Sequence, residues 1–122
     1  MATLPEYDVI VLSTPLYWWS YSAQLKIFID RIYSLSKFQE ASGIRSLLTG
    51  KTLALIATGG GPIEDNLELL ERQWKNPADM LGCSFISCLF PDTIVEAGEL
   101  KNDRLAANKA KEFGRLLASV TD

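Results

Sequence analysis

Three short apolar runs stand out along the chain, at residues 8–13, 52–57 and 83–90. Each is rich in aliphatic and β-branched residues, and each is closed by proline or by a run of glycines. Continuous apolar runs of this length are typical of strands that are buried on both faces of a parallel sheet. The pattern therefore predicts three buried strands.

Between these runs the apolar residues recur at three- and four-residue spacing, which is typical of amphipathic helices. A first helix is predicted from Ala23 onward, with Ser22 as its N-cap. A second is predicted after the glycines, where Asp65 and Glu68 have the spacing of a capping box, and it ends at Gly82. The residues expected to face inward are Leu25, Phe28, Ile29, Ile32 and Leu35 in the first helix and Leu67, Leu70 and Trp74 in the second.

A third helix is predicted at the end of the chain. Its expected inward residues are Leu105, Ala106, Phe113, Leu116 and Val120. Residues 37–51 have weak periodicity and predict an irregular connection with one helical turn around residues 45–48. The alternation of strands and helices predicts one α/β domain over residues 1–122, with a parallel sheet and helices on its faces.

Composition excludes several classes of partner. The chain has no apolar stretch long enough to span a bilayer, and its first residues lack the basic and apolar regions of a secretory signal. We therefore expect a cytoplasmic protein with no membrane partner. The formal net charge is -3 and the 12 basic residues are scattered, so nucleic acid is not an expected partner either.

The chemistry-bearing residues are few. Histidine is absent, which removes imidazole bases and argues against a serine hydrolase. Cys83 and Cys88 are five positions apart in a strand, so they point to opposite faces and are expected to be buried, unpaired thiols. Glu64 and Asp65 have ligand chemistry, but two acids at a helix start more often cap it, and no metal is assigned.

Two loops are expected to lie where ligands bind in such sheets, outside the carboxyl ends of the strands. Residues 14–21 carry three consecutive aromatics, Tyr17, Trp18 and Trp19, and residues 58–66 contain the run TGGG. That run is neither the GxGxxG nucleotide motif nor a Walker A loop. Planar aromatics beside a glycine backbone suit a flat, partly polar ring better than a phosphate. The alternative is that both tryptophans pack on a neighbouring helix or subunit and that the glycines only form a tight turn.

The stretch YDVIVLSTPLYWWSYSAQLKIFIDR resembles the flavin-ring loop of the NAD(P)H-dependent FMN reductase and quinone reductase families, which have a flavodoxin-like fold. GKTLALIATGGG is similar to their second flavin loop, and LGCSFISCLFPDTIVEAGEL to their last strand and the loop after it. The resemblance implies FMN as cofactor and NAD(P)H as co-substrate. No side chain is implied as a catalytic acid or base, because flavin itself takes the hydride. The cofactor-binding residues implied are Pro15, Leu16, Tyr17, Trp18, Trp19, Thr58, Gly59, Gly60 and Gly61.

Measured against that family, the sequence begins at what resembles the third strand of the order 2-1-3-4-5. The expected fold is thus a flavodoxin-like parallel sheet truncated to about three strands, 3-4-5 of the full fold, without the phosphate-binding loop. FMN binding is expected to be weak or to depend on a partner. The first strand would be an unpaired edge, so we expect a homo-oligomer formed through it or through the following helix, or a separate chain that supplies the other half.

Two functions follow from this comparison. One is an FMN-dependent NAD(P)H oxidoreductase of the FMN or quinone reductase type. The other is a non-catalytic remnant or interaction module that no longer binds FMN well. Binding of FMN distinguishes them.

Overall fold

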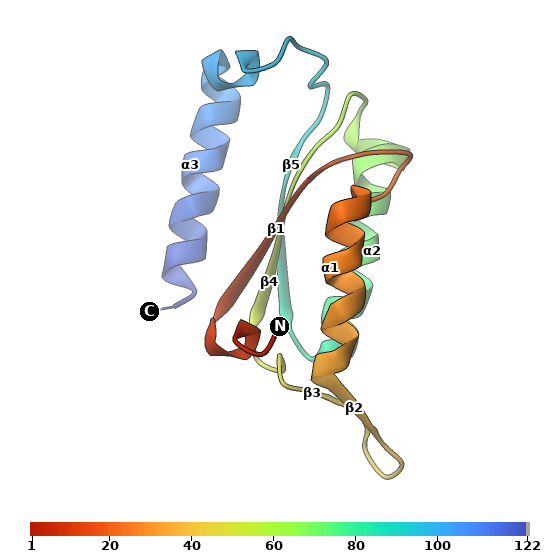
Figure 1. Ribbon diagram of the computed structural model, residues 1–122. Helices are drawn as coiled ribbons and strands as arrows, with labels where there is room; N and C mark the ends of the chain where they lie inside the picture. The colour runs from red at the N-terminus through yellow and green to blue at the C-terminus, as the bar shows by residue number, and fades with distance from the viewer. Residues whose placement is uncertain (122) are drawn as a thin grey trace.

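The computed structural model describes residues 1–121, and its centre is a three-stranded parallel sheet (Figure 1). The strands are β1 (Val9–Pro15), β4 (Thr52–Thr58) and β5 (Ser84–Phe90), in the order β1-β4-β5. Val9 pairs with Thr52, which in turn pairs with Ser84, so all three strands start and end together. The predicted parallel sheet of three strands is confirmed.

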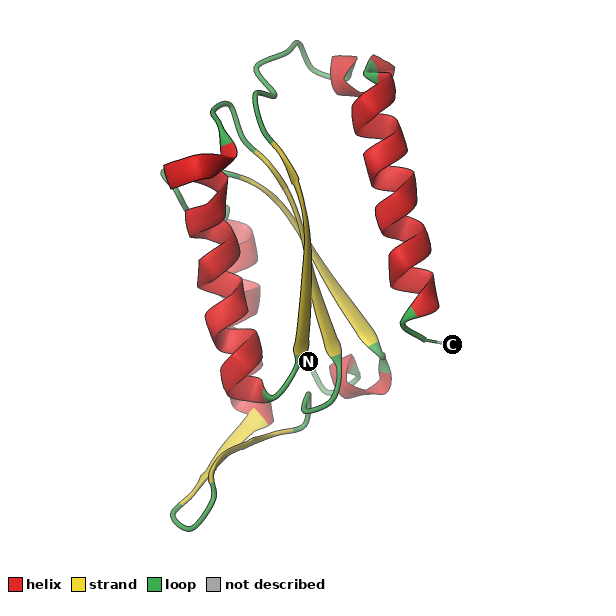
Figure 2. Cartoon of the chain, turned by 180° about the vertical axis from the view of Figure 1, so that it is seen from behind, coloured by secondary structure: helices red, strands yellow, loops and turns green. Residues whose placement is uncertain are grey.

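Helices cover both faces of this sheet. Helices α1 (Ala23–Ile32) and α2 (Glu68–Leu81) lie on one face and α3 (Arg104–Ser119) lies on the other, as both ribbon views show (Figures 1 and 2). Three short 3-10 segments, η1 (Leu4–Glu6), η2 (Tyr33–Leu35) and η4 (Glu99–Asn102), complete the connections. Ser22 caps α1 as predicted, since its hydroxyl accepts a hydrogen bond from the Leu25 amide at 3.3 Å. No helix of residues 1–121 is long and apolar enough to cross a bilayer.

Two hydrophobic clusters hold these layers together. The larger lies between the sheet and α1 and α2, and its largest fully buried side chains are Leu48, Leu53, Leu55, Leu67, Leu70 and Trp74. The smaller lies under α3 and contains Ala54, Cys88, Phe90 and Phe113. Cys83 belongs to the first cluster and Cys88 to the second, so the two thiols are buried on opposite faces as predicted.

The segment after α1 differs from the prediction of an irregular connection with a helical turn at residues 45–48. It forms an antiparallel hairpin of β2 (Ser36–Gln39) and β3 (Gly43–Ser46), in which Phe38 pairs with Ile44. Gly43 has φ +77, a conformation that glycine adopts without strain and that suits the tight turn. The hairpin projects from the end of the molecule opposite to the carboxyl ends of the strands (Figure 1).

The predicted capping box of the second helix is also wrong. Residues Ile63–Leu67 form an irregular turn, η3, in which Asp65 has φ +51 and is therefore outside the helix. Helix α2 begins at Glu68 with no side-chain cap. Its predicted end is confirmed, because Gly82 has the left-handed conformation typical of the residue after a helix.

In α3 the predicted inward face is only partly right. Phe113 is buried and Ala106 packs near it, but Leu105 is 82% exposed. Leu105 lies eight residues from Phe113, which places it about 80° around a helix with 3.6 residues per turn. Leu116 and Val120 are 48% and 42% exposed, so this helix leaves an apolar flank uncovered.

Candidate functional site

The two loops predicted to bind a ligand, residues 14–21 and 58–66, leave the sheet side by side. The ladder between β1 and β4 continues one step beyond the strands, because the Leu16 amide donates to the Thr58 carbonyl at 2.8 Å. On the other side of β4, the Gly59 amide donates to the Phe90 carbonyl at 3.0 Å. Both loops therefore start from backbone that the sheet holds in place, at the carboxyl ends of the strands.

The aromatic loop contains a tight turn of four residues, 17–20. The Tyr17 and Ser20 amides each donate to the other's carbonyl at 3.0 Å, and Trp18 and Trp19 lie between them with φ of +48 and +59. Positive φ at both central residues defines a type I′ turn, which normally carries Asn-Gly or Asp-Gly. For a bulky side chain this conformation is a strained outlier, costing about 1–3 kcal/mol per residue.

Helix α2 clamps this turn. Gln73 donates through Nε2 to the Trp19 carbonyl at 2.7 Å, and its Oε1 accepts from the Ser20 hydroxyl at 2.9 Å. On the other side, Thr14 Oγ1 accepts from the Ser22 amide at 3.1 Å and fixes the end of β1 to the start of α1. The surrounding structure thus holds the strained turn from two directions.

The glycine loop is fixed by close packing. A Cβ atom on Gly59 would lie 3.0 Å from Leu67 Cγ, one on Gly60 3.0 Å from Ile94 Cγ1, and one on Gly61 2.8 Å from Asn66 Nδ2. None of the three has a positive φ. Glycine is favoured here because neighbouring side chains approach the backbone, most firmly at Gly59, where Leu67 is fully buried.

The loop after β5 also holds the glycine loop in place. The Gly59 carbonyl accepts hydrogen bonds from both the amide and the hydroxyl of Thr93, each at 3.0 Å. The Asp92 amide donates to the Gly61 carbonyl at 2.9 Å. The Gly59 and Gly61 carbonyls therefore accept hydrogen bonds from the protein, whereas no backbone carbonyl within residues 1–121 accepts from the Gly60 or Gly61 amides.

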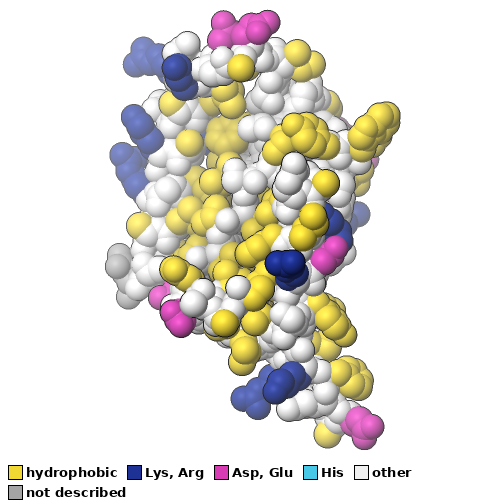
Figure 3. Space-filling model, in the orientation of Figure 1, with side chains coloured by type: hydrophobic (Ala, Val, Ile, Leu, Met, Phe, Trp, Pro, Cys, Tyr) yellow, Lys and Arg dark blue, Asp and Glu magenta, His cyan; other side chains and the backbone are white. Residues whose placement is uncertain are grey.

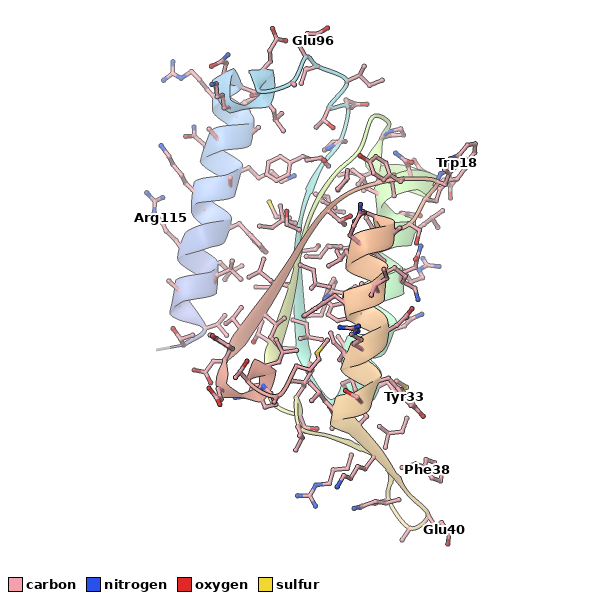
Figure 4. The ribbon with its side chains drawn as sticks, in the orientation of Figure 1. Trp18, Tyr33, Phe38, Glu40, Glu96 and Arg115 are labelled. Carbon is pink, nitrogen blue, oxygen red and sulfur yellow. The ribbon has the colours of Figure 1, made fainter. Side chains whose placement is uncertain are left out.

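A cavity of about 430 Å³ lies between the two loops. Its lining residues are Leu16, Trp18, Trp19, Gly60, Gly61, Pro62, Glu64, Asp65 and Asn66. Trp18 is 89% exposed, and it lies at the end of the molecule where the strands end (Figure 4). Of the residues predicted for cofactor binding, five line this cavity.

The other four predicted residues do not line it. Pro15 and Thr58 pair with each other at the ends of their strands, and Gly59 is buried between Leu16 and Leu67. Tyr17 is exposed beside the turn. These residues fix the shape of the two loops.

Sequence reasoning missed the lining residues of η3 and the proline before it. Pro62, Glu64, Asp65 and Asn66 all line the cavity, and Asn66 Nδ2 donates to the Pro62 carbonyl at 2.9 Å. The available signal is their position directly after the glycine run, but the spacing of the acids favours a helix cap instead. Among residues 1–121, two carboxylates and no cation line the cavity, so its charge disfavours a phosphate and allows a neutral ring.

Acid–base chemistry is not prominent around the loops. Burial raises the pKa of the Tyr21 phenol, which follows the aromatic turn, so this group stays protonated at neutral pH. Within residues 1–121, no group of three or more cysteine, aspartate or glutamate side chains is placed to hold a metal ion. The arrangement offers planar side chains and open backbone amides to a flat molecule.

A family model described as "Flavodoxin-like fold" matches residues 1–116. The chain belongs to this family. Its three parallel strands and the position of its cavity outside their carboxyl ends are those of a flavodoxin-like fold.

Two curated relatives of this flavodoxin-like chain are FMN-dependent NADH:quinone oxidoreductases. The one from Pseudomonas fluorescens is 29% identical over 133 residues, which cover 97% of this chain and 62% of the relative. The one from Legionella pneumophila is 29% identical over 117 residues, covering 91% of this chain and 57% of the relative. The chain thus spans less than two thirds of either relative.

This chain is also similar in fold to proteins of known structure. The FMN-dependent NADH-azoreductase from Bacillus anthracis, determined in complex with FMN, superposes with a TM-score of 0.64 at 16% identity. The match covers 95% of this chain and 59% of that protein. At this identity the likeness concerns the fold alone.

Proposed function

We propose that the cavity between the aromatic turn and the glycine loop holds the isoalloxazine ring of FMN, and that the chain serves NAD(P)H-dependent reduction of quinones or similar acceptors. The observation that carries this proposal is the pair of tryptophans held at positive φ beside the cavity. Strained backbone persists only where the surrounding structure imposes it, and it clusters at functional sites. The relatives named above supply the kind of reaction.

The residues present fit such a ring. Trp18 and Trp19 offer planar apolar surface, and the Gly60 and Gly61 amides are open to the ring's acceptor atoms. Glu64 and Asp65 disfavour the phosphate of FMN at this place. We therefore expect the phosphate contacts to come from outside this cavity, and the affinity of this chain alone for FMN to be weak.

Bound FMN supplies hydride acceptance and donation, so the protein's contribution is position and environment. Trp18 and Trp19 limit how the ring enters, and Gly60 and Gly61 line the opposite side of the cavity. Gln73 keeps the turn in shape through its bond to the Trp19 carbonyl. These residues orient the ring, and none of them needs to move a proton.

Titration with FMN tests this proposal. We expect the fluorescence of FMN to be quenched saturably by the protein, and Trp18→Ala to weaken the apparent affinity about tenfold, since stacking on one aromatic is worth about 1–3 kcal/mol. Phe38→Ala is the matched control, because Phe38 is 75% exposed and lies at the opposite end of the molecule (Figure 4). Oxidation of NADH with a quinone acceptor should depend on added FMN. Absence of quenching at high micromolar FMN would favour the non-catalytic alternative.

We also propose that another polypeptide, either a second copy or a separate chain, covers β1. This strand is at the edge of the sheet, Val11 is 43% exposed, and hydrophobic side chains gather on the side of the molecule between α3 and α1 (Figure 3). Parallel strands are normally buried, and an apolar edge favours pairing. If the chain is a non-catalytic interaction module instead, the same edge is the surface through which it would bind its partner.

Sedimentation tests this second proposal. We expect association at micromolar concentration that Val11→Lys prevents, because a charge on an edge strand blocks pairing. Val95→Lys, at a loop position that is 50% exposed, is the control and should leave association unchanged. A stable monomer in the unsubstituted protein would argue against a second copy.

A further inference from the structure

A second cavity, of about 440 Å³, lies between α1 and α2 and shares no lining residue with the first. It is lined by Ile29, Asp30 and Ile32 from α1, Tyr33 and Ser36 from the segment that follows, and Trp74, Pro77, Met80 and Leu81 from α2. Tyr33 lies toward the hairpin end of the molecule, far from Trp18 at the other end (Figure 4). The cavity is thus separate from the proposed flavin site.

Two lining residues carry buried polar atoms without a partner. Across residues 1–121, the buried side-chain atoms that make no hydrogen bond are Trp74 Nε1 and Ser36 Oγ, and both residues line this cavity. Trp74 is only 1% exposed. An indole N–H is a donor only, and a buried donor without an acceptor is costly. The missing partner of Trp74 is therefore an acceptor atom.

The other lining residues are mostly apolar and indicate what kind of molecule the cavity could bind. Ile29, Ile32 and Leu81 make the interior apolar, and the exposed Tyr33 and Met80 lie at the mouth.

The charge of the lining is already balanced. The Asp30 carboxylate, which is the one formal charge of the lining, is bonded to Lys26 on the same helix. A volume of this size exceeds that of one water, about 30 Å³, and is within the range of small-molecule pockets. The lining therefore suits a neutral molecule with an apolar body.

We propose that this cavity is a binding site for a small neutral molecule that presents a carbonyl oxygen on an apolar, ring-sized body. The carbonyl accepts the hydrogen bond of the Trp74 indole, and Ser36, which lines the same cavity, supplies a second donor. The apolar body lies against the aliphatic residues of α1 and α2. This site does not depend on whether the first cavity binds FMN.

Matched probes test the site in the unsubstituted protein. Acetophenone has the required carbonyl, and α-methylstyrene has the same shape with a CH₂ group in place of the oxygen. The three tryptophans give three indole N–H signals in a ¹⁵N-labelled sample, and Trp18→Phe and Trp19→Phe assign that of Trp74 by elimination. We expect acetophenone to move the Trp74 signal downfield saturably and to bind about fivefold more tightly than α-methylstyrene, as one net hydrogen bond implies.

Variants add a second test. Ser36→Ala should weaken acetophenone binding by about two- to fivefold, whereas Ser42→Ala, at an exposed hairpin position, should leave it unchanged. Equal binding of the two probes, or no saturable shift of the Trp74 signal, would overturn the proposal. A Trp74 signal that moves with protein concentration alone would also overturn it, because a second copy would then fill the cavity.

Discussion

The tryptophans of this chain occupy opposite environments. Trp74 is 1% exposed in the core between the sheet and α2, in relaxed helical backbone. Trp18 and Trp19 are 89% and 49% exposed, at the end of a loop and in left-handed backbone. The first position gains free energy from burial, whereas the second pair gains little burial and carries strain.

This contrast separates stability from function. Burial accounts for the apolar ring of a core tryptophan, even where its N–H is left for a ligand, but burial does not account for exposed aromatics in an unfavourable turn. Gln73 and the strand ends hold that turn in place. The rest of the fold therefore stabilises a left-handed backbone conformation that is unfavourable for the two tryptophans. The predictions that follow test whether the two environments respond oppositely to substitution.

Removing the buried indole should have the largest effect. Trp74→Ala leaves a cavity in the main core and is expected to lower the free energy of unfolding by about 3–5 kcal/mol. Trp18→Ala, by contrast, should change it by less than about 0.5 kcal/mol or raise it. Urea unfolding of both variants measures this difference. Equal losses would contradict the assignment of the two environments.

Giving the turn its preferred residues should stabilise the protein and impair ligand binding. The double variant Trp18→Asn, Trp19→Gly suits a type I′ turn and is expected to raise the free energy of unfolding by about 1–2 kcal/mol. The same variant should lose measurable FMN binding. A double variant that is less stable than the unsubstituted protein would show that the turn is not strained.

Removing the Gln73 side chain should have a smaller effect on stability and on FMN binding. Gln73→Ala removes the hydrogen bonds to Trp19 and Ser20, and should cost about 0.5–1 kcal/mol of stability and weaken FMN binding a few-fold. Asn76→Ala, another exposed position on α2, is the control and should change neither quantity. Unchanged FMN affinity in Gln73→Ala would mean that the turn keeps its shape without the clamp.

The smallest predicted effect is a dependence on alkaline pH. Burial raises the pKa of the Cys83 and Cys88 thiols, so the folded state disfavours their charged forms. Their contribution to stability is fully present below the unfolded thiol pKa of about 8.5 and declines as the pH rises above it. Urea unfolding between about pH 7.5 and 9.5 should show this decline. The double variant Cys83→Ala, Cys88→Ala should show less of it, and an identical decline would exclude the thiols as its source.

Most of the fold could be predicted because its signals are local. The three apolar runs, the N-cap Ser22 and the terminal Gly82 each act within a few residues, and the parallel order follows from their alternation with helices. The hairpin at residues 36–46 escaped prediction because its strands are four residues long and half exposed, so they carry little apolar pattern. The exposure of Leu105 depends on how α3 is rotated against the sheet, which its own spacing does not fix.

The site was predictable only in outline. Its two loops follow from the ends of β1 and β4, and five predicted residues line the cavity. Gln73 was beyond prediction because it is more than 50 residues away from Trp19 and contacts it only through the tertiary fold. Asp65 was misinterpreted because a capping-box spacing does not reveal that its backbone is left-handed.

The central claim is that Trp18 and Trp19 contact a flat ligand while Trp74 serves the core. The most direct test follows the three indole N–H signals of the ¹⁵N-labelled protein during titration with FMN. The Trp18 and Trp19 signals should move together and saturably while the Trp74 signal stays in place. Movement of the Trp74 signal alone, or of none of the three at saturating FMN, would contradict it.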